Sequence, residues 1–474
     1  MKKLLLTTTA LATMAASSAF AGGMAKDSDL EIKLGGEFDA QAGFRSQKSE
    51  YVKATSVGLY RANTQTNGDN ATDTTVFKRG VTPGNNSIGF DTVAAMHATI
   101  KNKTASGLVY GAQVGLQTTT RSTTSAGQNV MDRSYLFMEN DMGRVELGSN
   151  ESAANAMRIG ADRLARATGG IDGDWKKYVE LDTFTSTEFT LPRVREANFI
   201  TSPGLVLEKV EDGGSPINQF LKGDEKSRKL TYFTPEFNGF QAGVSYIPDT
   251  RNSGQDYIND LGTQSSDTSS YGQYWGVTVK NAFSGGFSWK GTFDKAHHVK
   301  LSAVGETGKA KASGLIGSDY DDYKNVASYV LGAQWNWKEL GLAASYGSHG
   351  DSLVNKSATS TNKFKNGSFW TLGASWTQGP WGTSVTYMDS SNNKNKFSLV
   401  SVGADYEVAP GLMPYAEVSM FDMKQKRDYR GPLVPALTTT AGTFTAGQGD
   451  NKTQSNTAYK NKGTAFILGT KINF

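Results

Sequence analysis

The feature that most constrains the fold of this 474-residue sequence is a long alternation of apolar and polar residues that recurs along the chain. In the first segment Ile32, Leu34, Phe38, Ala40, Ala42 and Phe44 alternate with Lys33, Glu37, Asp39, Gln41 and Arg45. The alternation recurs at 88–101, 108–121, 329–337, 370–387, 400–408 and 466–474. A period of two indicates β-strands, and these segments exceed the ~5–6 residues of a typical soluble strand. The sequence therefore predicts an all-β fold, an antiparallel barrel that crosses a membrane.

The connections between the strands alternate between long and short. The long ones cover 46–85, 120–130, 150–226, 249–271, 309–325, 350–367, 390–396 and 424–459. Short turns lie near Asn102, Asn140, Glu236, 285–295, Lys338, Gly379 and Pro410, although 284–298 could instead hold an irregular strand. Eight long and seven short connections join sixteen strands. Long loops on one side, short turns on the other, and Trp and Tyr at strand ends are typical of outer-membrane barrels.

The N-terminus has the pattern of an export signal. Met1-Lys2-Lys3 precedes a short apolar run from Leu4 to Ala16, and Ala19-Phe20-Ala21 follows as a cleavage site. The run is too short for a membrane-spanning helix. We expect a signal peptide over 1–21 and one barrel domain over 22–474. Loss of Lys2 and Lys3 lowers the formal net charge from +4 to +2, which argues against a nucleic-acid partner.

The longest connection, 150–226, is expected to have a role of its own, because a compact domain seldom carries so long an insertion without one. It holds Gly169-Gly170, Trp175, Tyr178 and charges of both signs, so it is not low-complexity sequence. We interpret it as a loop that folds into the barrel mouth and narrows a pore. Trp175 and Tyr178 could pin this loop to the wall or form a stacking track for a sugar, and we favour the first.

Charged side chains on the inner wall and on this loop are the candidate site residues, because a ring of fixed charge across a narrow wet gap biases which ions enter. The wall candidates are Arg133, Lys229, Arg121, Lys33, Glu37 and Asp39. The loop candidates are Glu151, Arg158, Asp162, Arg163, Arg166, Asp172 and Asp174. Alternation places Arg133 and Lys229 inside, where a charge tolerates water. Most loop charges are expected to be solvated or paired within the loop, and the sequence makes no prediction between anion and cation preference.

An enzyme of the outer membrane is the main rival class, and the residues argue against it. The chain has four histidines, His97, His297, His298 and His349, and no serine motif accompanies them. It has no cysteine, and no two histidines stand four residues apart, so we expect neither a metal site nor a cofactor. A substrate-specific channel and a surface adhesin remain as alternative functions.

Several motifs in this order make the chain resemble the Gram-negative general porin family. They are Asp132-Arg133-Ser134-Tyr135-Leu136 with Gly143-Arg144-Val145-Glu146-Leu147-Gly148, the run from Leu230 to Phe240, Gly403-Ala404-Asp405-Tyr406 with Ala409-Pro410-Gly411-Leu412, and the ending Lys471-Ile472-Asn473-Phe474. The resemblance covers nearly all of the sequence after the signal peptide. It implies a sixteen-stranded barrel in the bacterial outer membrane, in contact with its lipids and lipopolysaccharide, that passes small hydrophilic solutes passively as a homotrimer.

The resemblance also assigns roles to particular positions. The family's third extracellular loop, which forms the constriction, matches 150–226, and its final aromatic residue, part of a signal read by the barrel-assembly machinery, matches Phe474. Arg133 and Lys229 match the basic wall positions that face an acidic loop. The chain departs from the family pattern at Glu37 and Ser87, where several members carry a basic side chain, and its loop is longer than usual.

Overall fold

The computed structural model describes residues 30–47, 58–62, 76–80, 86–119, 131–179, 199–208, 227–250, 276–294, 296–313, 324–353, 367–392, 395–424, 438–439, 442–443 and 460–474. The predicted signal peptide and Arg121 lie outside these residues. None of the helices in the described part is long and apolar enough to span a membrane.

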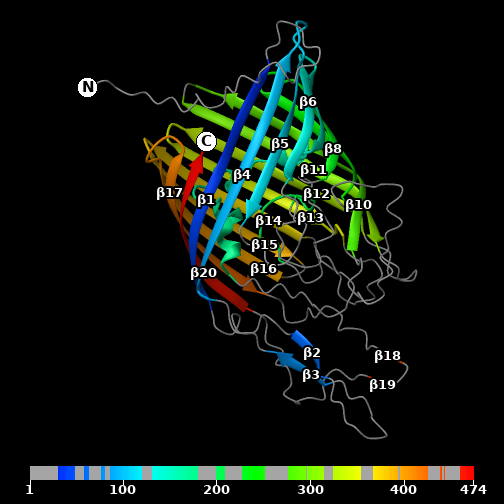
Figure 1. The fold of residues 1–474 in the computed structure, drawn as a ribbon, viewed down its shortest axis with the longest axis vertical. Coiled ribbons are helices and arrows are strands. Elements are labelled where there is room, and N and C mark those ends of the chain that lie inside the picture. The colour runs from blue at the N-terminus through cyan, green and yellow to red at the C-terminus, as the bar shows by residue number, and fades with distance from the viewer. Residues whose placement is uncertain are drawn as a thin grey trace, which may run out of the picture.

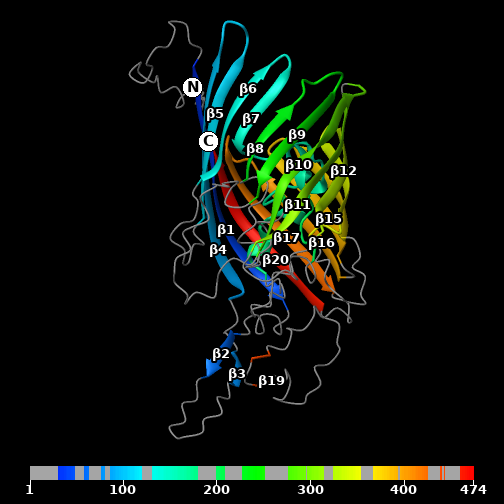
Figure 2. The same cartoon turned by 90° about the vertical axis from the view of Figure 1, so that its right-hand side faces the viewer.

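Sixteen antiparallel strands close into one barrel, which confirms the predicted fold class and strand number (Figures 1 and 2). The strands are β1 (Glu31–Gln47), β4 (Ile88–Lys103), β5 (Val109–Thr119), β6 (Met131–Asn140), β7 (Gly143–Ser149), β8 (Arg228–Phe233), β9 (Phe240–Asp249), β10 (Gly276–Thr292), β11 (His297–Ser313), β12 (Val326–Trp337), β13 (Leu340–Gly350), β14 (Gly367–Gln378), β15 (Trp381–Asn392), β16 (Asn395–Tyr406), β17 (Leu412–Lys424) and β20 (Lys460–Asn473). Two small hairpins, β2 (Gly58–Ala62) with β3 (Val76–Gly80) and β18 (Thr438–Thr439) with β19 (Gly442–Thr443), belong to the long connections.

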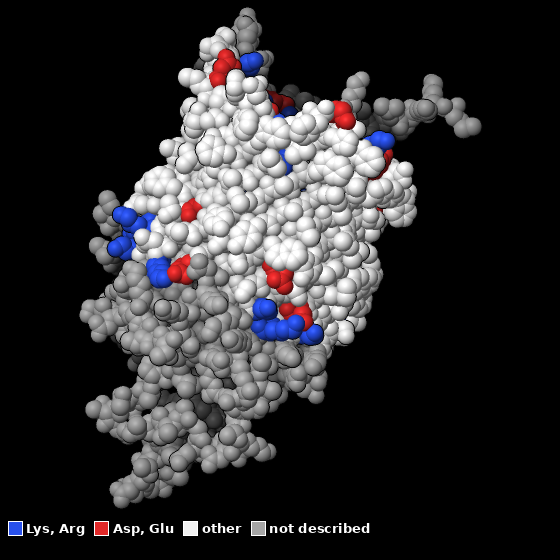
Figure 3. Space-filling view, turned by 180° about the vertical axis from the view of Figure 1, so that it is seen from behind, with Lys and Arg blue, Asp and Glu red and all other residues white. Residues whose placement is uncertain are grey.

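The two faces of the sheet follow the predicted alternation, with the large apolar side chains on the outside. Phe90 is 83% exposed and Leu372 is 52% exposed, whereas inward neighbours such as Asp91 and Thr371 are buried. A soluble protein would not leave so many large hydrophobics uncovered, so this surface is built to contact hydrocarbon. Seen from behind, the described surface has a broad band almost free of charged residues, with most of the visible Lys, Arg, Asp and Glu near its borders (Figure 3).

The last strand closes the barrel, as expected from its alternation. β20 pairs with β17 on one side and with β1 on the other, so no strand edge is left unpaired in the sheet. The terminal residue takes part in this closure, because the amide of Gly36 donates to the carbonyl oxygen of Phe474 at 2.9 Å and the amide of Phe474 donates to that of Gly36 at 3.1 Å. The Phe474 ring lies over Gly36, where a side chain would collide with it.

The turn predicted over 285–295 is wrong in extent, because only 293–296 separate β10 from β11. Gly285 and Gly286 lie inside β10 and pair with Gly305 and Val304. These glycines interrupt the side-chain alternation without interrupting the backbone ladder, which explains why they resemble a turn in sequence. The irregular strand considered as the alternative is present, with a bulge between Lys280 and Phe283.

Candidate pore constriction

The described part of the 150–226 connection lies against the inner wall of the barrel and follows it from strand to strand. Helix α2 (Ala153–Met157) packs against β8–β11, η2 (Ala161–Leu164) against β13–β15, η3 (Gly170–Asp172) against β15–β17, and η4 (Asp174–Lys177) against β20. We call residues 151–179 the outgoing leg. Residues 199–208, the returning leg, run back along the same wall from β15 to β11.

Side chains of the wall satisfy the backbone of the outgoing leg, which has little secondary structure of its own. Backbone amides of the leg donate to wall hydroxyls: Ala153 to Ser245 on β9 at 2.8 Å, Ile159 to Ser302 on β11 at 3.1 Å, Ala161 to Thr371 on β14 at 3.3 Å, and Arg166 to Ser384 on β15 at 2.8 Å. On β17, the carboxylate of Glu417 accepts from the amides of Thr168 and Gly170. A buried amide without a partner would cost about 1–3 kcal/mol, so this series of acceptors fixes the path of the leg.

The returning leg is held in the same way. The amide of Val206 donates to the hydroxyl of Ser328 on β12 at 3.4 Å, and the amide of Leu207 donates to the carboxylate of Glu306 on β11 at 2.9 Å. Its carbonyl oxygens are bound by Ser390 on β15, which donates to Ile200, and by His349 on β13, whose Nε2 lies 2.8 Å from that of Gly204. Four strands, β11, β12, β13 and β15, thus fix a segment of ten residues.

Inward-facing glycines give the outgoing leg room to lie directly on the sheet. A methyl group on Gly332 of β12 would stand 2.2 Å from the carbonyl oxygen of Ile159, and one on Gly373 of β14 would stand 2.8 Å from Cβ of Ala161. A methyl group on Gly403 of β16 would stand 3.0 Å from the carbonyl oxygen of Arg166, whereas one on Gly382 of β15 would meet the guanidinium of Arg166 at 2.8 Å. The contacts at Gly332 and Gly373 leave no room for a side chain, so these two glycines form a bed for the loop backbone.

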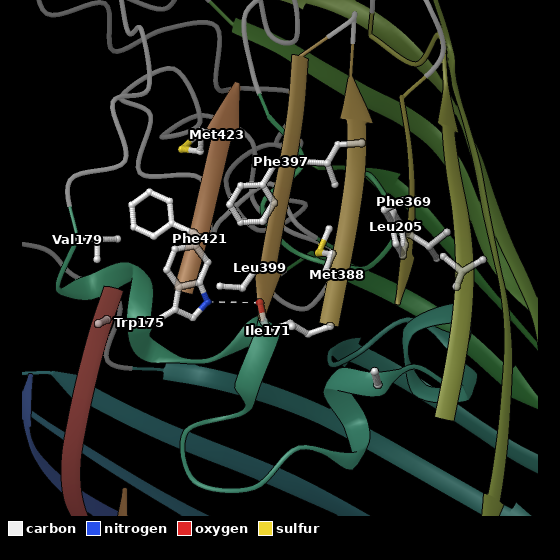
Figure 4. Packing of buried hydrophobic residues seen from close by; sticks show 14 of the residues in the cluster. Ile171, Trp175, Val179, Leu205, Phe369, Met388, Phe397, Leu399, Phe421 and Met423 are labelled. Carbon is white, nitrogen blue, oxygen red and sulfur yellow. Dashed lines mark hydrogen bonds between the residues drawn. The ribbon is translucent and has the colours of Figure 1, made fainter. Parts of the chain in front are cut away.

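An apolar cluster anchors the far end of the outgoing leg (Figure 4). The ring of Trp175 is fully buried and stacks against Phe397 of β16 and Phe421 of β17, with ring centroids 5.9 and 5.7 Å apart. Its indole nitrogen donates to the carbonyl oxygen of Ile171 at 3.4 Å. These phenylalanines point into the barrel, where water would otherwise meet them, so the loop covers an apolar part of the inner wall. Trp175 pins the loop to the wall, which is the interpretation favoured from sequence.

An ion cluster joins the two legs. Arg158 is buried and its guanidinium binds Asp162 and Glu208, each at 2.8 Å. Burial opposes its charge, but the field of the two carboxylates outweighs it and raises the pKa of Arg158 well above its ordinary value. Removing Arg158 would leave two buried carboxylates without their shared counter-ion. The cluster therefore ties the start of the outgoing leg to the end of the returning leg, and its members are structural.

The tip of the outgoing leg continues along the wall past β20 to the first strands of the barrel, β1 and β4. Lys177 binds Asp91 of β4 at 2.7 Å and Asp174 at 3.0 Å, and Gln41 of β1 donates to Asp174 at 2.6 Å. Burial lowers the pKa of Lys177, but the charge of Asp174 and the bond to Asp91 raise it further, so its pKa lies above the ordinary 10.5. The Tyr178 ring rests on Gly43, where a methyl group would stand 2.2 Å from it. We call these contacts the tip latch.

The structure separates the predicted wall residues into different environments. Arg133 faces inward from β6, opposite Gly115, and remains partly exposed. Lys229 also faces inward but is buried, and its ammonium binds the carbonyl oxygens of Asn150 and Ser227 at the base of the loop. Its predicted place on the pore surface is therefore wrong, because the loop base covers it. Asp39 is buried and accepts from Tyr415 at 2.7 Å, Glu37 is half-buried, and Lys33 lies exposed beside Glu31.

The loop candidates are mostly paired, as expected. Arg163 keeps 40% of its side chain exposed while it binds Asn155. Arg166 contacts Thr377 and Asp405 on the wall, and Asp172 binds Lys176. Glu151 is half-buried beside α2.

Sequence reasoning missed the acids that hold the loop to the wall. Glu417, Glu306, Asp91 and Asp405 all face inward, at positions where the alternation calls for a polar residue. Glu208 was missed on the loop itself. The sequence does contain a signal for the wall acids. Each is a carboxylate at an inward position of a strand that lies far from the predicted constriction.

The described helices of the loop leave part of the lumen open on the side of β5–β7. Inward residues there include Gln113, Arg133 and Arg144, and Arg144 pairs with Glu146 at 2.7 Å and with Glu139 at 3.1 Å. A hollow of about 200 Å³ lies between this side and β1, with Lys33 and Lys101 on its rim. Among the residues that the structure describes, no group of three or more His, Cys, Asp and Glu side chains could hold a metal ion.

A closed barrel with an apolar outer band and a segment laid inside it defines the class as an outer-membrane β-barrel channel. The chain belongs to the Gram-negative porin family, whose model matches residues 7–426. It is 33% identical to an uncharacterised protein of Rickettsia felis over the full length of both chains, and 32% identical to one of Rickettsia typhi over 84% of this chain and 88% of that protein. The anion-selective porin from Comamonas acidovorans has the same fold, with a TM-score of 0.51, 13% identity, and coverage of 94% of this chain and all of that one.

The protein is therefore a porin of the bacterial outer membrane and not an enzyme. Outer-membrane barrels place their short turns in the periplasm and their long loops outside, so we expect that orientation for this chain.

Proposed function

We propose that small hydrophilic solutes diffuse through the gap between the outgoing leg and strands β5–β7, and that the 150–226 loop sets the width of this gap. The observation that carries the proposal is the ordered series of wall acceptors, from Ser245 on β9 to Glu417 on β17, which holds the loop to one side of the lumen. A loop fixed in this way narrows the lumen without crossing it. The channel is passive, because diffusion through a fixed wet gap needs no moving part.

We further propose that the gap favours small anions. In several ion pairs of the lumen the cation is the exposed member: Arg163 is 40% exposed against 4% for Asp162, Arg144 30% against 8% for Glu146, and Lys177 26% against 8% for Asp91. Arg133 adds a cation on the open side. Lys177 and Asp174 are equally exposed and add no bias, and Glu139 is more exposed than Arg144. Accessible charge acts most directly on ions that pass through water.

The test is the reversal potential in a planar bilayer under a salt gradient. Wild type should show the sign of an anion-preferring channel, and Arg133→Glu with Arg163→Glu should move the potential toward cations. Lys290→Glu, an exposed pair partner of Glu236 at the short-turn end, is the matched charge control and should leave the potential unchanged. A wild-type potential of cationic sign would overturn the anion preference, and an insulating folded barrel would overturn the diffusion route.

Assembly follows from the family and stands as part of the proposal. The chain would lose residues 1–21 on export, be recognised by the barrel-assembly machinery through Phe474, and form a homotrimer surrounded by lipid and lipopolysaccharide. Phe474 suits that role because its ring is 65% exposed at the barrel seam. Amino-terminal sequencing of the exported protein and electrophoresis without heating test the cleavage and the trimer, and Phe474→Ala should lower the amount of assembled barrel.

A further inference from the structure

The outer face of β11–β15 carries a depression of about 510 Å³ in a surface that otherwise presents large apolar side chains. Its floor is formed by outward-facing alanines. Ala333 of β12 pairs with Ala344 of β13, and Ala374 of β14 lies one strand further on, opposite Leu342. Larger residues surround them: Val299, Trp335, Leu342, Leu372, Val385 and Tyr387. We call this the alanine groove.

The periplasmic end of the groove is built from stacked rings. His297, Trp335 and Trp337 lie nearly parallel, with centroids 5.6 Å apart for His297 and Trp335 and 6.4 Å apart for the two tryptophans. The indole nitrogen of Trp335 donates to Nδ1 of His297 at 3.1 Å, which orients the imidazole. Tryptophans in such a position lie at the level of the lipid headgroups.

A fixed cation stands beside these rings. Lys338 occupies the two-residue turn between β12 and β13 with a φ of 50°, and its ammonium lies 5.4 Å from the centre of the Trp337 ring. This cation–π contact holds the ammonium over the ring. The carboxylate of Asp294 lies 3.7 Å from Nε2 of His297, so the cation open to a ligand at this end is Lys338. A groove that is apolar along its length and carries a lysine at its short-turn end has the charge and polarity of a lipid binding site.

We propose that this site binds one glycerophospholipid of the periplasmic leaflet, with an acyl chain in the alanine groove and the phosphate at Lys338. Lipid contacts on a smooth barrel wall are exchanged freely. The groove instead offers the chain walls on several sides, which adds van der Waals contacts that a smooth surface lacks. The proposal is independent of the route and charge preference of the pore, since all its residues lie on the outer face or at the turn.

The experiment uses the purified full-length porin in detergent micelles with added phosphatidylglycerol, and native mass spectrometry counts the lipid retained. Ala344→Phe fills the groove and should abolish retention, whereas Leu331→Phe adds the same ring on β12 outside the groove and should leave retention at the wild-type level. Lys338→Asn removes the ammonium while asparagine tolerates the positive φ, and should weaken retention about fivefold. Lys290→Asn is its control at another turn-end lysine.

Two further arms keep the result unambiguous. Diacylglycerol has the acyl chains but no phosphate, and wild type should retain it no better than Lys338→Asn retains phosphatidylglycerol. Unchanged conductance and heat-modifiable migration of every variant establish that the barrel is folded. Equal lipid retention by wild type and Ala344→Phe would overturn the site. A variant that changes the number of associated chains without changing the bound lipid would also overturn it, because the groove would then be an interface between copies of the chain.

Discussion

At the scale of single residues, glycine defines where the loop can lie. Gly332, Gly373, Gly382 and Gly403 face inward on four different strands, and each lies under the outgoing leg. Glycine weakens a strand, because it loses more backbone entropy on folding and contributes no side chain to packing. That cost is acceptable here because the missing side chains let two backbones approach. The position of these glycines therefore reports the path of the loop more directly than its charged residues do.

The glycine under the loop tip provides a sharp test of this view. Gly43→Ala would place a methyl group 2.2 Å from the Tyr178 ring, whereas Gly89→Ala would place one 3.4 Å from the same ring, which is an ordinary contact. We expect Gly43→Ala to displace the tip at a cost of about 1–3 kcal/mol and to alter single-channel conductance. Gly89→Ala should match wild type. Identical conductance in all three proteins would show that Tyr178 does not hold the tip.

Alkaline pH should weaken the tip latch. Because the pKa of Lys177 is raised in the folded protein, its ion pairs stabilise the latch fully below the ordinary value of 10.5 and lose this effect as the pH rises through the raised value. Current noise in a planar bilayer should therefore grow above pH 10.5 in wild type. The Lys177→Gln variant should show high current noise already at neutral pH, with no further rise at alkaline pH. The Lys177→Arg variant should keep its low current noise to a higher pH than wild type.

At the scale of elements, the loop is ordered by the wall and not by its own helices. Helix α2 has five residues and the other helical turns have three or four, which is far below the length at which a helix is stable alone. Its amides instead find acceptors on β9–β17, and its apolar residues find Phe397 and Phe421. Folding of the loop should thus depend on prior closure of the barrel.

Truncation of the central anchor tests this dependence. Trp175→Ala removes a fully buried ring from between Phe397 and Phe421, and such changes cost about 3–5 kcal/mol. The cost should fall on the loop, so that limited proteolysis cuts 151–179 while the barrel still migrates as a folded species. Trp381→Ala removes an exposed ring from the outer face and is the control. Resistance of the Trp175 variant to proteolysis would mean that hydrogen bonds alone hold the leg.

The sequence predicted the strands well because a sheet with only one face in water has a side-chain pattern of period two. A shift of one residue in the register would turn every side chain to the wrong face, so the pattern is strict. It predicted the 285–295 turn wrongly because Gly285 and Gly286 hide the alternation while keeping the ladder. The partners of the loop charges were beyond sequence reasoning. Whether Arg158 meets Glu208, fifty positions away, or Lys229 meets the loop base depends on the course of a segment with no periodicity.

At the scale of the whole molecule, the barrel and the loop are separate layers with different sources of stability. The barrel is closed by a continuous ladder that ends with Phe474 bonded to Gly36, and none of those bonds involves the loop. The loop depends on the barrel for acceptors, for glycine beds and for the Asp91 and Gln41 ends of its latch. The loop therefore depends on the barrel more than the barrel depends on the loop, and the protein should tolerate loss of the loop better than loss of any strand.

Deletion of 160–177 puts that asymmetry to the test. The variant should still insert, resist unfolding in cold detergent and conduct in discrete steps, because every barrel strand and its pairing remain. Its steps should be larger than those of wild type, since the segment that occupies the β13–β17 side of the lumen is gone. The newly exposed rings of Phe397 and Phe421 should lower the thermal stability of the deletion variant. Adding Phe397→Ser and Phe421→Ser should restore part of this stability in the deletion variant, whereas the same two changes should destabilise the wild-type protein. Smaller or absent steps from a folded deletion variant would mean that the loop keeps the lumen open instead of narrowing it.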